Sequence, residues 1–476
     1  MNSSLKQGEG VSRSSLFDVL SPFDRSVVGT VPLSQVADTQ DVIARAQHGA
    51  LQAAALTRGR RAEMLFKAAD LVEQRAENFA VTIASEAGKT IRQARKETAR
   101  CVNTLRLCAE EAKRLAGEII PFDSYAGSEN RSGYYTLEPL GVILAITPFN
   151  DPLNLVAHKL GPAIAAGNGV ILKPSLLAPL SAQALTECLW ESGVPADVLQ
   201  IVHGGPDVAS ALVREKSIRM VTFTGGPATG EAITRDGGLK KMAMDLGGNA
   251  PVIVMADCDL RDAAESCVSG SFWAAGQNCI GTQRIFVAAS AFNQFVEYFV
   301  ELTKKMVVGN PLDEASDMGP MITESQAERI ERWVDEAVSM GARVLTGHRR
   351  EGALYYPTVL VDVPSHCHLW ADEAFAPVVS ISSFANLKDA VAAANASESS
   401  LQAGIFTNNL EAALAAAGSL QAGGVMINDS SDYRFDGMPF GGFKYGSLGR
   451  EGVRFSMMEM TQPKVICFKR NTANYA

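Results

Sequence analysis

The chain has 476 residues, which is too long for one hydrophobic core and indicates two or three domains. Its net charge of -9, from 43 basic and 52 acidic residues, disfavours a nucleic-acid-binding protein, which needs a basic surface. Because the N-terminus lacks an apolar signal segment, no apolar run reaches about 18 residues and the cysteines form no CxxC pair, we expect a cytoplasmic protein with reduced cysteines and no membrane span.

The N-terminal third is predicted to be mostly helical. After short strands and turns in "SPFDRSVVGTVPL", the segment 62–77 places Met64, Leu65, Ala68, Leu71 and Val72 at helical spacing, with charged residues on the opposite face. Helical patterns continue to about residue 115. This region is therefore expected to supply helices rather than strands to the fold.

Between residues 141 and 245 the pattern changes to alternating strands and helices. Strands are predicted at 141–146, 169–175, 199–204 and 220–225. The helix predicted at 153–167 is expected to be interrupted at Pro162, and the next one to be capped by Ser181. Four such alternations predict a parallel sheet covered by helices, which binds ligands beyond the carboxyl ends of its strands.

A second α/β region begins at about residue 246. Its strands are predicted at 251–255, 282–289, 342–347, 356–363, 377–384, 402–408 and 423–429. This half carries Cys279, so we expect a cleft between the two regions. The stretch "SHCHLW" at 365–370 has no second ligand pair nearby, and we expect no metal site there.

Cys279 stands apart from the other seven cysteines. It lies in "GQNCIGTQR", among glycines and polar side chains, whereas most of the others lie in apolar or helical surroundings. A structural cysteine behaves as a small hydrophobic residue, whereas a reactive one needs polar, partly accessible surroundings. Cys279 is therefore the candidate nucleophile.

Several motifs taken together resemble the aldehyde dehydrogenase family. They are "TPFNDP", "ILKPS", "FTGGPATG", "MDLGGNAP", "GQNCIGT", "EAFAPV" and "PFGGFKYGSLGRE", and they occur in family order. The resemblance covers residues 21–468. The stretches "AITPFNDPLNLVAHKLGPAIAAGN", "GGVMINDSSDYRFDGMPFGG" and "SLGREGVRFSMMEMTQPK" resemble the lactaldehyde dehydrogenase branch, and the first also resembles phosphonoacetaldehyde dehydrogenases.

This resemblance implies an α/β fold with three parts. A Rossmann-like dinucleotide-binding domain would comprise 1–121 and 141–245, and a catalytic α/β domain 246–448. A small bridging β element would comprise 122–140 and 456–472. Such bridges add strands to a neighbour's sheet, so a homodimer or homotetramer is expected.

The resemblance also implies the catalytic roles. Cys279 would attack the aldehyde, and the side chain of Asn150 with the Cys279 backbone amide would hold the resulting oxyanion. Asp245 stands where the family has a glutamate, so it would be a general base shortened by one methylene, about 1.5 Å. The alternatives are a turn residue for Asn150 and a capping carboxylate for Asp245.

NAD or NADP is the implied cofactor. Lys173 would reach the adenosine ribose, Glu373 the nicotinamide ribose, and Phe375 would pack nearby. Three glycines would let a helix N-terminus approach the pyrophosphate, namely Gly225, Gly226 and Gly230. Leu176 replaces a ribose-binding glutamate common in NAD-preferring members, so nothing at that position repels a 2′-phosphate and both cofactors remain open.

The substrate is expected to be a small functionalised aldehyde. Arg100 could bind an anionic tail, or it could be an exposed helical arginine paired with Glu97. Asp151 beside Asn150, and Asn278 where phosphonoacetaldehyde enzymes carry arginine, favour a neutral hydroxy-aldehyde such as lactaldehyde. Phosphonoacetaldehyde or another anionic aldehyde, a CoA-acylating reaction, and a binding protein without activity are the alternatives.

Overall fold

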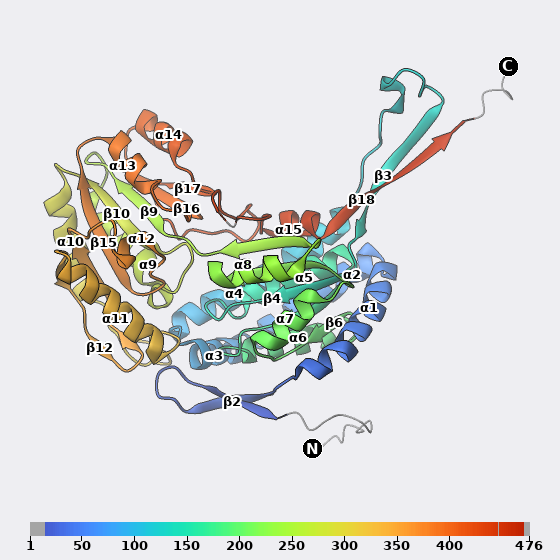
Figure 1. Cartoon of the computed structure of the whole chain (residues 1–476), viewed down its shortest axis with the longest axis horizontal. Helices are drawn as coiled ribbons and strands as arrows, with labels where there is room; N and C mark the ends of the chain where they lie inside the picture. The colour runs from blue at the N-terminus through green and yellow to red at the C-terminus, as the bar shows by residue number, and fades with distance from the viewer. Residues whose placement is uncertain (1–14, 446, 471–476) are drawn as a thin grey trace.

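The computed structural model describes residues 15–445 and 447–470. The chain forms two α/β lobes, each around its own sheet, and a two-stranded arm that projects from the first lobe (Figure 1). A short N-terminal hairpin lies along the first lobe and consists of β1 (Leu16–Leu20) and β2 (Val27–Pro32). Within the described ranges, none of the helices has the length and apolar character needed to cross a membrane.

The first lobe contains a five-stranded parallel sheet in the order β6-β5-β4-β7-β8. Its strands are β4 (Val142–Ile146), β5 (Gly169–Lys173), β6 (Leu199–Ile201), β7 (Ile218–Gly225) and β8 (Lys241–Leu246). β4 and β5 are buried along their whole length, which is why their sequences show no polar alternation. The predicted parallel sheet is confirmed. β8 was not among the predicted strands, because its sequence "KMAMDL" contains neither a continuous apolar run nor a clear alternation of apolar and polar residues.

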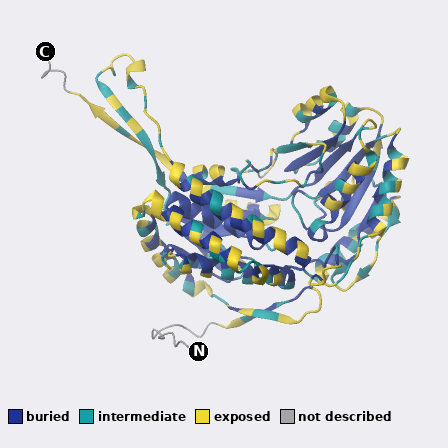
Figure 2. Ribbon diagram, turned by 180° about the vertical axis from the view of Figure 1, so that it is seen from behind, coloured by how far each residue is buried: buried dark blue, intermediate teal, exposed yellow. Residues whose placement is uncertain are grey.

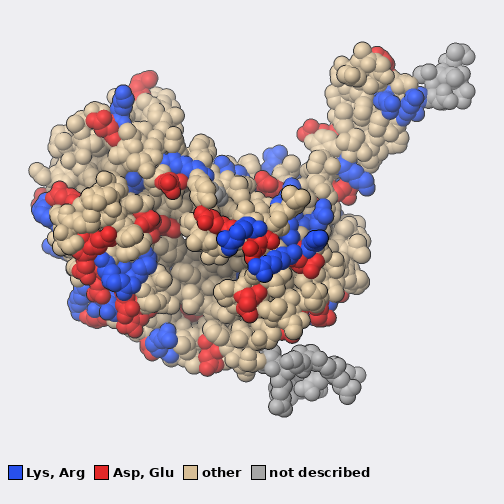
Figure 3. All heavy atoms as spheres, in the orientation of Figure 1, with Lys and Arg blue, Asp and Glu red and all other residues tan. Residues whose placement is uncertain are grey.

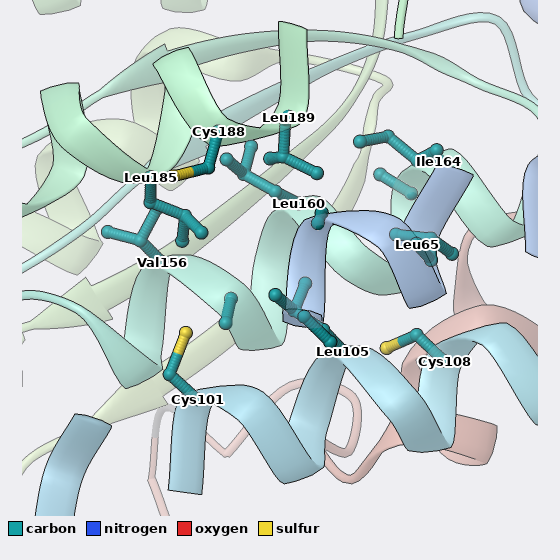
Figure 4. Close-up of a cluster of buried hydrophobic side chains, with 14 of the residues drawn as sticks. Leu65, Cys101, Leu105, Cys108, Val156, Leu160, Ile164, Leu185, Cys188 and Leu189 are labelled. Carbon is teal, nitrogen blue, oxygen red and sulfur yellow. The ribbon is translucent and has the colours of Figure 1, made fainter. Parts of the chain in front are cut away.

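Helices from the N-terminal half of the chain surround this sheet. They are α1 (Thr39–Ala55), α2 (Arg58–Gln74), α3 (Ala76–Ala87), α4 (Ile91–Arg114), α5 (Asn154–Ala166), α6 (Leu180–Glu191), α7 (Pro206–Arg214) and α8 (Pro227–Gly237). In the core, Leu105 and Cys108 of α4 lie against α5 (Figure 4). The two helices approach closely because Gly161 has no side chain: a Cβ there would lie 2.6 Å from the Cys108 sulfur.

The second lobe contains a seven-stranded sheet in the order β11-β14-β15-β10-β9-β16-β17, in which only the β11–β14 pair is antiparallel. Its strands are β9 (Ala250–Val254), β10 (Thr282–Ala288), β11 (Arg343–Thr346), β14 (Thr358–Val361), β15 (Val378–Phe384), β16 (Gln402–Phe406) and β17 (Gly424–Ile427). All seven predicted strands are confirmed. A separate small hairpin consists of β12 (Arg350–Glu351) and β13 (Leu354–Tyr355).

Helices cover this second sheet as well. They are α9 (Leu260–Phe272), α10 (Phe292–Lys304), α11 (Glu324–Ser339), α12 (His368–Ala371), α13 (Leu387–Ala394) and α14 (Leu410–Ser419). The stretch "SHCHLW" lies at the start of α12, where Cys367 is buried. The described residues contain no group of three or more His, Cys, Asp or Glu side chains arranged to hold a metal ion.

The projecting arm pairs β3 (Arg131–Pro139) with β18 (Thr461–Lys469) in antiparallel register. Both strands are exposed or only partly buried over most of their length (Figure 2). Within the expected bridging segment 456–472, residues 456–459 form the end of helix α15 (Val453–Glu459), which packs on α5, and strand β18 follows it. Positions 471–472 lie outside the described residues.

Two local predictions in the first lobe are wrong. α5 is continuous through Pro162, because every residue of this helix is buried and its packing outweighs the loss of one backbone hydrogen bond. Ser181 does not cap α6, which already begins at Leu180. Instead, the Glu86 carboxylate of α3 accepts hydrogen bonds from the Leu180 and Ser181 backbone amides at 2.7 and 2.8 Å.

Candidate active site

A cavity of about 510 Å³ lies between the two lobes. Its lining comes from α4, from the loop after β4, from the segment around Cys279 and from the loop after β17. The residues are Lys96, Arg100, Asn150, Asp151, Leu155, Ser269, Trp273, Ala274, Gln277, Asn278, Cys279, Ile280, Asp429, Asp432, Tyr433, Arg434 and Phe440. The cavity thus brings together four predicted site residues, namely Cys279, Asn150, Arg100 and Asn278.

The backbone before Cys279 makes an unusual turn. Ala274, Ala275 and Gly276 have φ of 50°, 55° and 67°, in the left-handed region. Only glycine fits at 276, because a Cβ there would lie 2.1 Å from the Ala376 carbonyl oxygen. The next residues then face the cavity, where Cys279 is partly exposed.

The thiol of Cys279 is not strongly acidified by its surroundings. Burial raises its pKa well above the usual range, and Asp245 and Glu373 raise it further, whereas Arg434 opposes them. The sulfur therefore carries its proton at neutral pH, and that proton must leave before or during nucleophilic attack.

Asn150 follows strand β4 and borders the same cavity. Its side chain forms no hydrogen bond with the residues that the structure describes, so the local bond expected of a turn residue is absent. The neighbouring Asp151 is ion-paired with buried Lys89 and, at 3.4 Å, with Arg100. The negative charge beside Asn150 is thus paired with two cations, which are shared with Glu97 and Asp436.

Asp245 lies on β8, opposite Thr224 of β7, and borders a separate cavity of only about 10 Å³. Phe440 lines both this small cavity and the one that holds Cys279. Both carboxylate oxygens of Asp245 are buried without a hydrogen-bond partner among the described residues, so the capping alternative is wrong. Burial, reinforced by the charge of Glu451, raises the pKa of Asp245 to about 7.

A buried cluster of charges surrounds Asp245. Glu451 pairs with Lys159 at 2.9 Å and with Arg434 at 3.0 Å, and these cations hold the pKa of Glu451 well below its usual range against the effect of burial. Arg434 also stacks on Phe440 at 3.8 Å. Sequence reasoning missed Arg434, Glu451 and Lys159, although all three lie within segments that resemble the family.

Arg100 is not the exposed helical arginine considered as its alternative. It pairs with Asp436 at 2.8 Å and with Asp151, whereas Glu97 pairs with buried Lys89 at 2.7 Å. About a third of the Arg100 side chain remains exposed to the cavity. Its guanidinium has five donor N–H groups, so two ion pairs leave others free to meet a ligand.

A second cavity of about 510 Å³ lies at the carboxyl ends of the first lobe's strands. It is bordered by Lys173 and Leu176, by the turn at Gly204 and Gly205, and by α7 and α8. Lys173 is buried, which lowers its pKa, and among the described residues its ammonium donates a hydrogen bond only to the Pro174 carbonyl, at 3.4 Å. The groove is mostly apolar, and Lys173 at its end has hydrogen-bond donors left for a ligand. Such a groove fits the adenosine half of a dinucleotide.

The glycines predicted to approach a pyrophosphate lie at the N-terminus of α8. Gly226 is its exposed N-cap, where an added Cβ would meet nothing within 4 Å. Gly230 lies one turn further, with Leu246 where its Cβ would be, and Gly225 ends β7 against Phe223. The open N-terminus of α8 fits an anionic group.

Glu373 and Phe375 lie on the other side of the cysteine segment. Glu373 accepts a hydrogen bond from the Gly248 amide at 3.0 Å, and burial raises its pKa to about 7. Phe375 contacts Phe149, the neighbour of Asn150, edge to face at 6.0 Å. Both residues border a small cavity that also includes Asn278, so they lie close to Cys279.

Comparison with known proteins gives a consistent assignment. The Aldehyde dehydrogenase family matches residues 10–466. Aspartate-semialdehyde dehydrogenase 1 of Pseudomonas canavaninivorans is 58% identical, over 94% of this chain and 96% of that protein. 3-Sulfolactaldehyde dehydrogenase of Priestia aryabhattai is 46% identical, over 85% of each chain. Lactaldehyde dehydrogenase of Methanococcus maripaludis is 38% identical, over 94% of this chain and 96% of that protein.

Solved structures of other dehydrogenases have closely similar folds. Aldehyde dehydrogenase 21 from Physcomitrella patens, in complex with the reaction product succinate, has a TM-score of 0.95 and 37% identity over 98% of this chain and 97% of that one. Glyceraldehyde-3-phosphate dehydrogenase from Methanocaldococcus jannaschii, complexed with NADP, has a TM-score of 0.93 and 38% identity over 97% and 100%.

Proposed function

Because the chain belongs to the aldehyde dehydrogenase family and is an oxidoreductase dependent on NAD or NADP, we propose that it oxidises a short aliphatic aldehyde bearing an anionic group to the carboxylic acid. The observation that carries this proposal is the cavity in which Cys279 and Asn150 share the lining with Arg100 and Arg434. Two arginines and a nucleophile in one small cavity suit a short substrate with a reactive carbonyl at one end and negative charge at the other.

The proposed anionic aldehyde differs from the neutral hydroxy-aldehyde that was expected from the sequence. That expectation rested partly on Asp151, whose charge is compensated by Lys89 and Arg100. The relatives named for aspartate semialdehyde and sulfolactaldehyde act on small aldehydes that carry an acidic group. Asp429 and Asp432 also line the cavity. Their carboxylates could bind the ammonium group of a substrate that carries both charges, such as aspartate semialdehyde.

In the first half-reaction, the Cys279 sulfur attacks the carbonyl carbon and its proton leaves to solvent through the open cavity. The Asn150 amide and the Cys279 backbone N–H donate hydrogen bonds to the oxygen, which has become an alkoxide. Each well-placed donor of this kind contributes about 2.7–4 kcal/mol to the transition state. NAD or NADP, held by Lys173 and the α8 N-terminus, supplies the hydride acceptor when bound.

In the second half-reaction, Asp245 removes a proton from the water that attacks the Cys279 thioester. A carboxylate with a pKa of about 7 is well matched to this task at neutral pH. Its oxygens have no hydrogen bonds to break before they turn toward the cysteine. The acid is then released, and the departing Cys279 thiolate takes up the proton held by Asp245 and returns to the thiol.

The test is a panel of aldehydes assayed through the absorbance of the reduced cofactor, with NAD and with NADP. Succinate semialdehyde and aspartate semialdehyde should have a kcat/KM at least about tenfold above propionaldehyde and lactaldehyde, equivalent to about 1.4 kcal/mol. Cys279→Ala should be inactive with every aldehyde and still bind cofactor. Equal or faster oxidation of the neutral aldehydes would refute the anionic substrate and restore lactaldehyde as the leading candidate.

The CoA-acylating alternative predicts a different product. If water is not activated well by Asp245, the thioester could pass to CoA instead. Product analysis with and without CoA separates the two reactions: free acid formed at the same rate in both assays supports hydrolysis. A CoA ester, formed only with CoA and faster than the acid, would show that the enzyme is acylating.

The proposed assembly is a homodimer or homotetramer held by the arm. Two strands rarely remain stable alone in water, and β18 exposes Val465 by 58% and Phe468 by 56%. A neighbouring copy that adds its sheet to the arm would cover these side chains. We place the enzyme in a reducing compartment such as the cytoplasm, because all eight cysteines are free thiols.

A further inference from the structure

A third cavity, of about 440 Å³, adjoins the one that contains Cys279. It is lined by the first turns of α4, by α9, by the end of α10 and by the segment that follows. Lys96, Ser269 and Trp273 line both cavities. These three residues therefore mark the junction of the two cavities, and the cavity of about 440 Å³ is here called the vestibule.

Three cations on α4 follow this route. Arg92, Lys96 and Arg100 are spaced four residues apart, so they lie on one face of the helix. Arg92 lines the vestibule, Lys96 lines the junction and Arg100 lines the catalytic cavity. A single helix face thus places one cation in the vestibule, one at the junction and one in the cavity of Cys279.

The three cations differ in how far their charge is compensated. Arg92 pairs with Asp317 at 2.6 Å, and Arg100 pairs with Asp151 and Asp436. Lys96 has no carboxylate within ion-pair distance among the described residues. Its ammonium instead lies over the Trp273 ring, 5.3 Å from the centroid. An aromatic face positions a cation without cancelling its charge.

The carboxylates of the vestibule do not offset Lys96. Glu265 forms an ion pair with Arg261 at 3.4 Å, and Asp317 forms one with Arg92. Lys305, the third cation of the vestibule, is paired with Glu301 at 2.5 Å. The whole chain has a net charge of -9, and the face drawn in Figure 3 intersperses acidic and basic residues. Asp429 and Asp432 line the catalytic cavity together with Lys96, but Lys96 forms no ion pair with them, so its positive charge stands without a paired carboxylate among the described residues.

We propose that Lys96, held over Trp273, is the residue that captures the anionic aldehyde and directs it from the vestibule to Cys279, and so sets the preference for anionic over neutral substrates. This inference rests on the proposed function. The charge acts on approach rather than on the reacting atoms, so it should affect kcat/KM and leave kcat nearly unchanged.

The experiment compares Lys96→Gln with the wild-type enzyme, using succinate semialdehyde and propionaldehyde at low and high salt. At low ionic strength the variant should lose about fivefold in kcat/KM for succinate semialdehyde, as expected for one unit charge near the surface. The loss should shrink at about 0.5 M salt, where screening acts within a few ångströms. Propionaldehyde should be oxidised equally by both enzymes, and Lys96→Arg should restore the wild-type values.

Lys113→Gln is the matched control. Lys113 lies on the same helix and also sits over an aromatic ring, that of Phe66 at 4.9 Å, but it lines neither cavity. This variant removes the same charge and the same type of contact, and it should behave as the wild type. Equal effects of the two substitutions, or an equal loss with propionaldehyde, would overturn the role of Lys96. A wild-type enzyme that does not prefer anionic aldehydes would overturn both this inference and the proposed function.

Discussion

Replacing Asp245 by asparagine removes the proposed base of thioester hydrolysis while leaving the nucleophile and the oxyanion donors in place. Asparagine has nearly the same size, and no hydrogen bond is lost, because both carboxylate oxygens lack partners among the described residues. Acylation and hydride transfer should therefore proceed, whereas hydrolysis should slow by about 10²–10⁴, the usual contribution of a positioned general base.

The pH dependence of the deacylation rate tests the role of Asp245 most directly. With the pKa of Asp245 at about 7, the rate of deacylation should rise about tenfold per pH unit below pH 7 and level off above it. In Asp245→Asn the slow residual rate should not show this transition. Asp432→Asn, assayed with succinate semialdehyde, is the control, because Asp432 is a partly buried carboxyl with a raised pKa that lines the cavity of Cys279 but not the small cavity of Asp245.

The assay is stopped-flow absorbance of the reduced cofactor. Wild-type enzyme limited by deacylation should give a burst close to one equivalent per active site, and Asp245→Asn should keep the burst and lose the steady state. Asp245→Glu should raise the steady-state rate several-fold, because the added methylene extends the carboxylate by about 1.5 Å. A lower rate would mean that the backbone of β8 is adjusted to aspartate. No burst in Asp245→Asn, with Cys279 still reactive toward aldehyde, would refute the role in deacylation.

The same substitution should also change stability with pH. The folded-state pKa of about 7 lies above the ordinary value of 3.8, so the folded protein retains a proton that the unfolded chain releases between these pH values. Wild-type stability should thus fall as pH rises from about 4 to 7, by at most about 4 kcal/mol. Asp245→Asn should melt above the wild type at pH 8, with a difference that shrinks toward pH 5. A constant difference would show that burial does not perturb Asp245.

The remaining predictions concern other parts of the molecule. Asn150→Ala should slow acylation by about 10²–10³ in single turnovers, and an unchanged rate would remove it from the oxyanion site. NADP should be used within about tenfold of NAD, and Leu176→Glu should shift kcat/KM toward NAD; strict NAD preference in the wild type would contradict this. Gly161→Ala should lower stability by about 1–3 kcal/mol in thermal melts, because its methyl would meet Cys108, whereas Gly418→Ala, in open space, should not. Phe468→Asp should reduce the mass measured by light scattering, whereas the control Leu410→Asp, at a helix position that is still more exposed, should leave it unchanged.

Much of the fold could be predicted because local patterns dictate it. The apolar runs of β4 and β5 are buried on both sides, and the seven strands of the second sheet match their predicted segments. Predictions failed where distant residues decide the outcome. α6 is capped by Glu86, some 95 residues away, and α5 continues through Pro162 because all its residues are buried.

The sequence by itself predicted most of the strands and helices from periodicity, and its motifs, through their resemblance to the aldehyde dehydrogenase family, implied candidate roles for Cys279, Asn150 and Lys173, because periodicity and motifs are local properties of the chain. Only the tertiary structure decided the electrostatics of the site. The two ion-pair partners of Arg100 lie 51 and 336 positions away in the sequence, and no periodic pattern predicts such pairs. The pKa of Asp245 depends on its burial and on Glu451. Charges interact through space and through the surrounding dielectric, and both are set by packing.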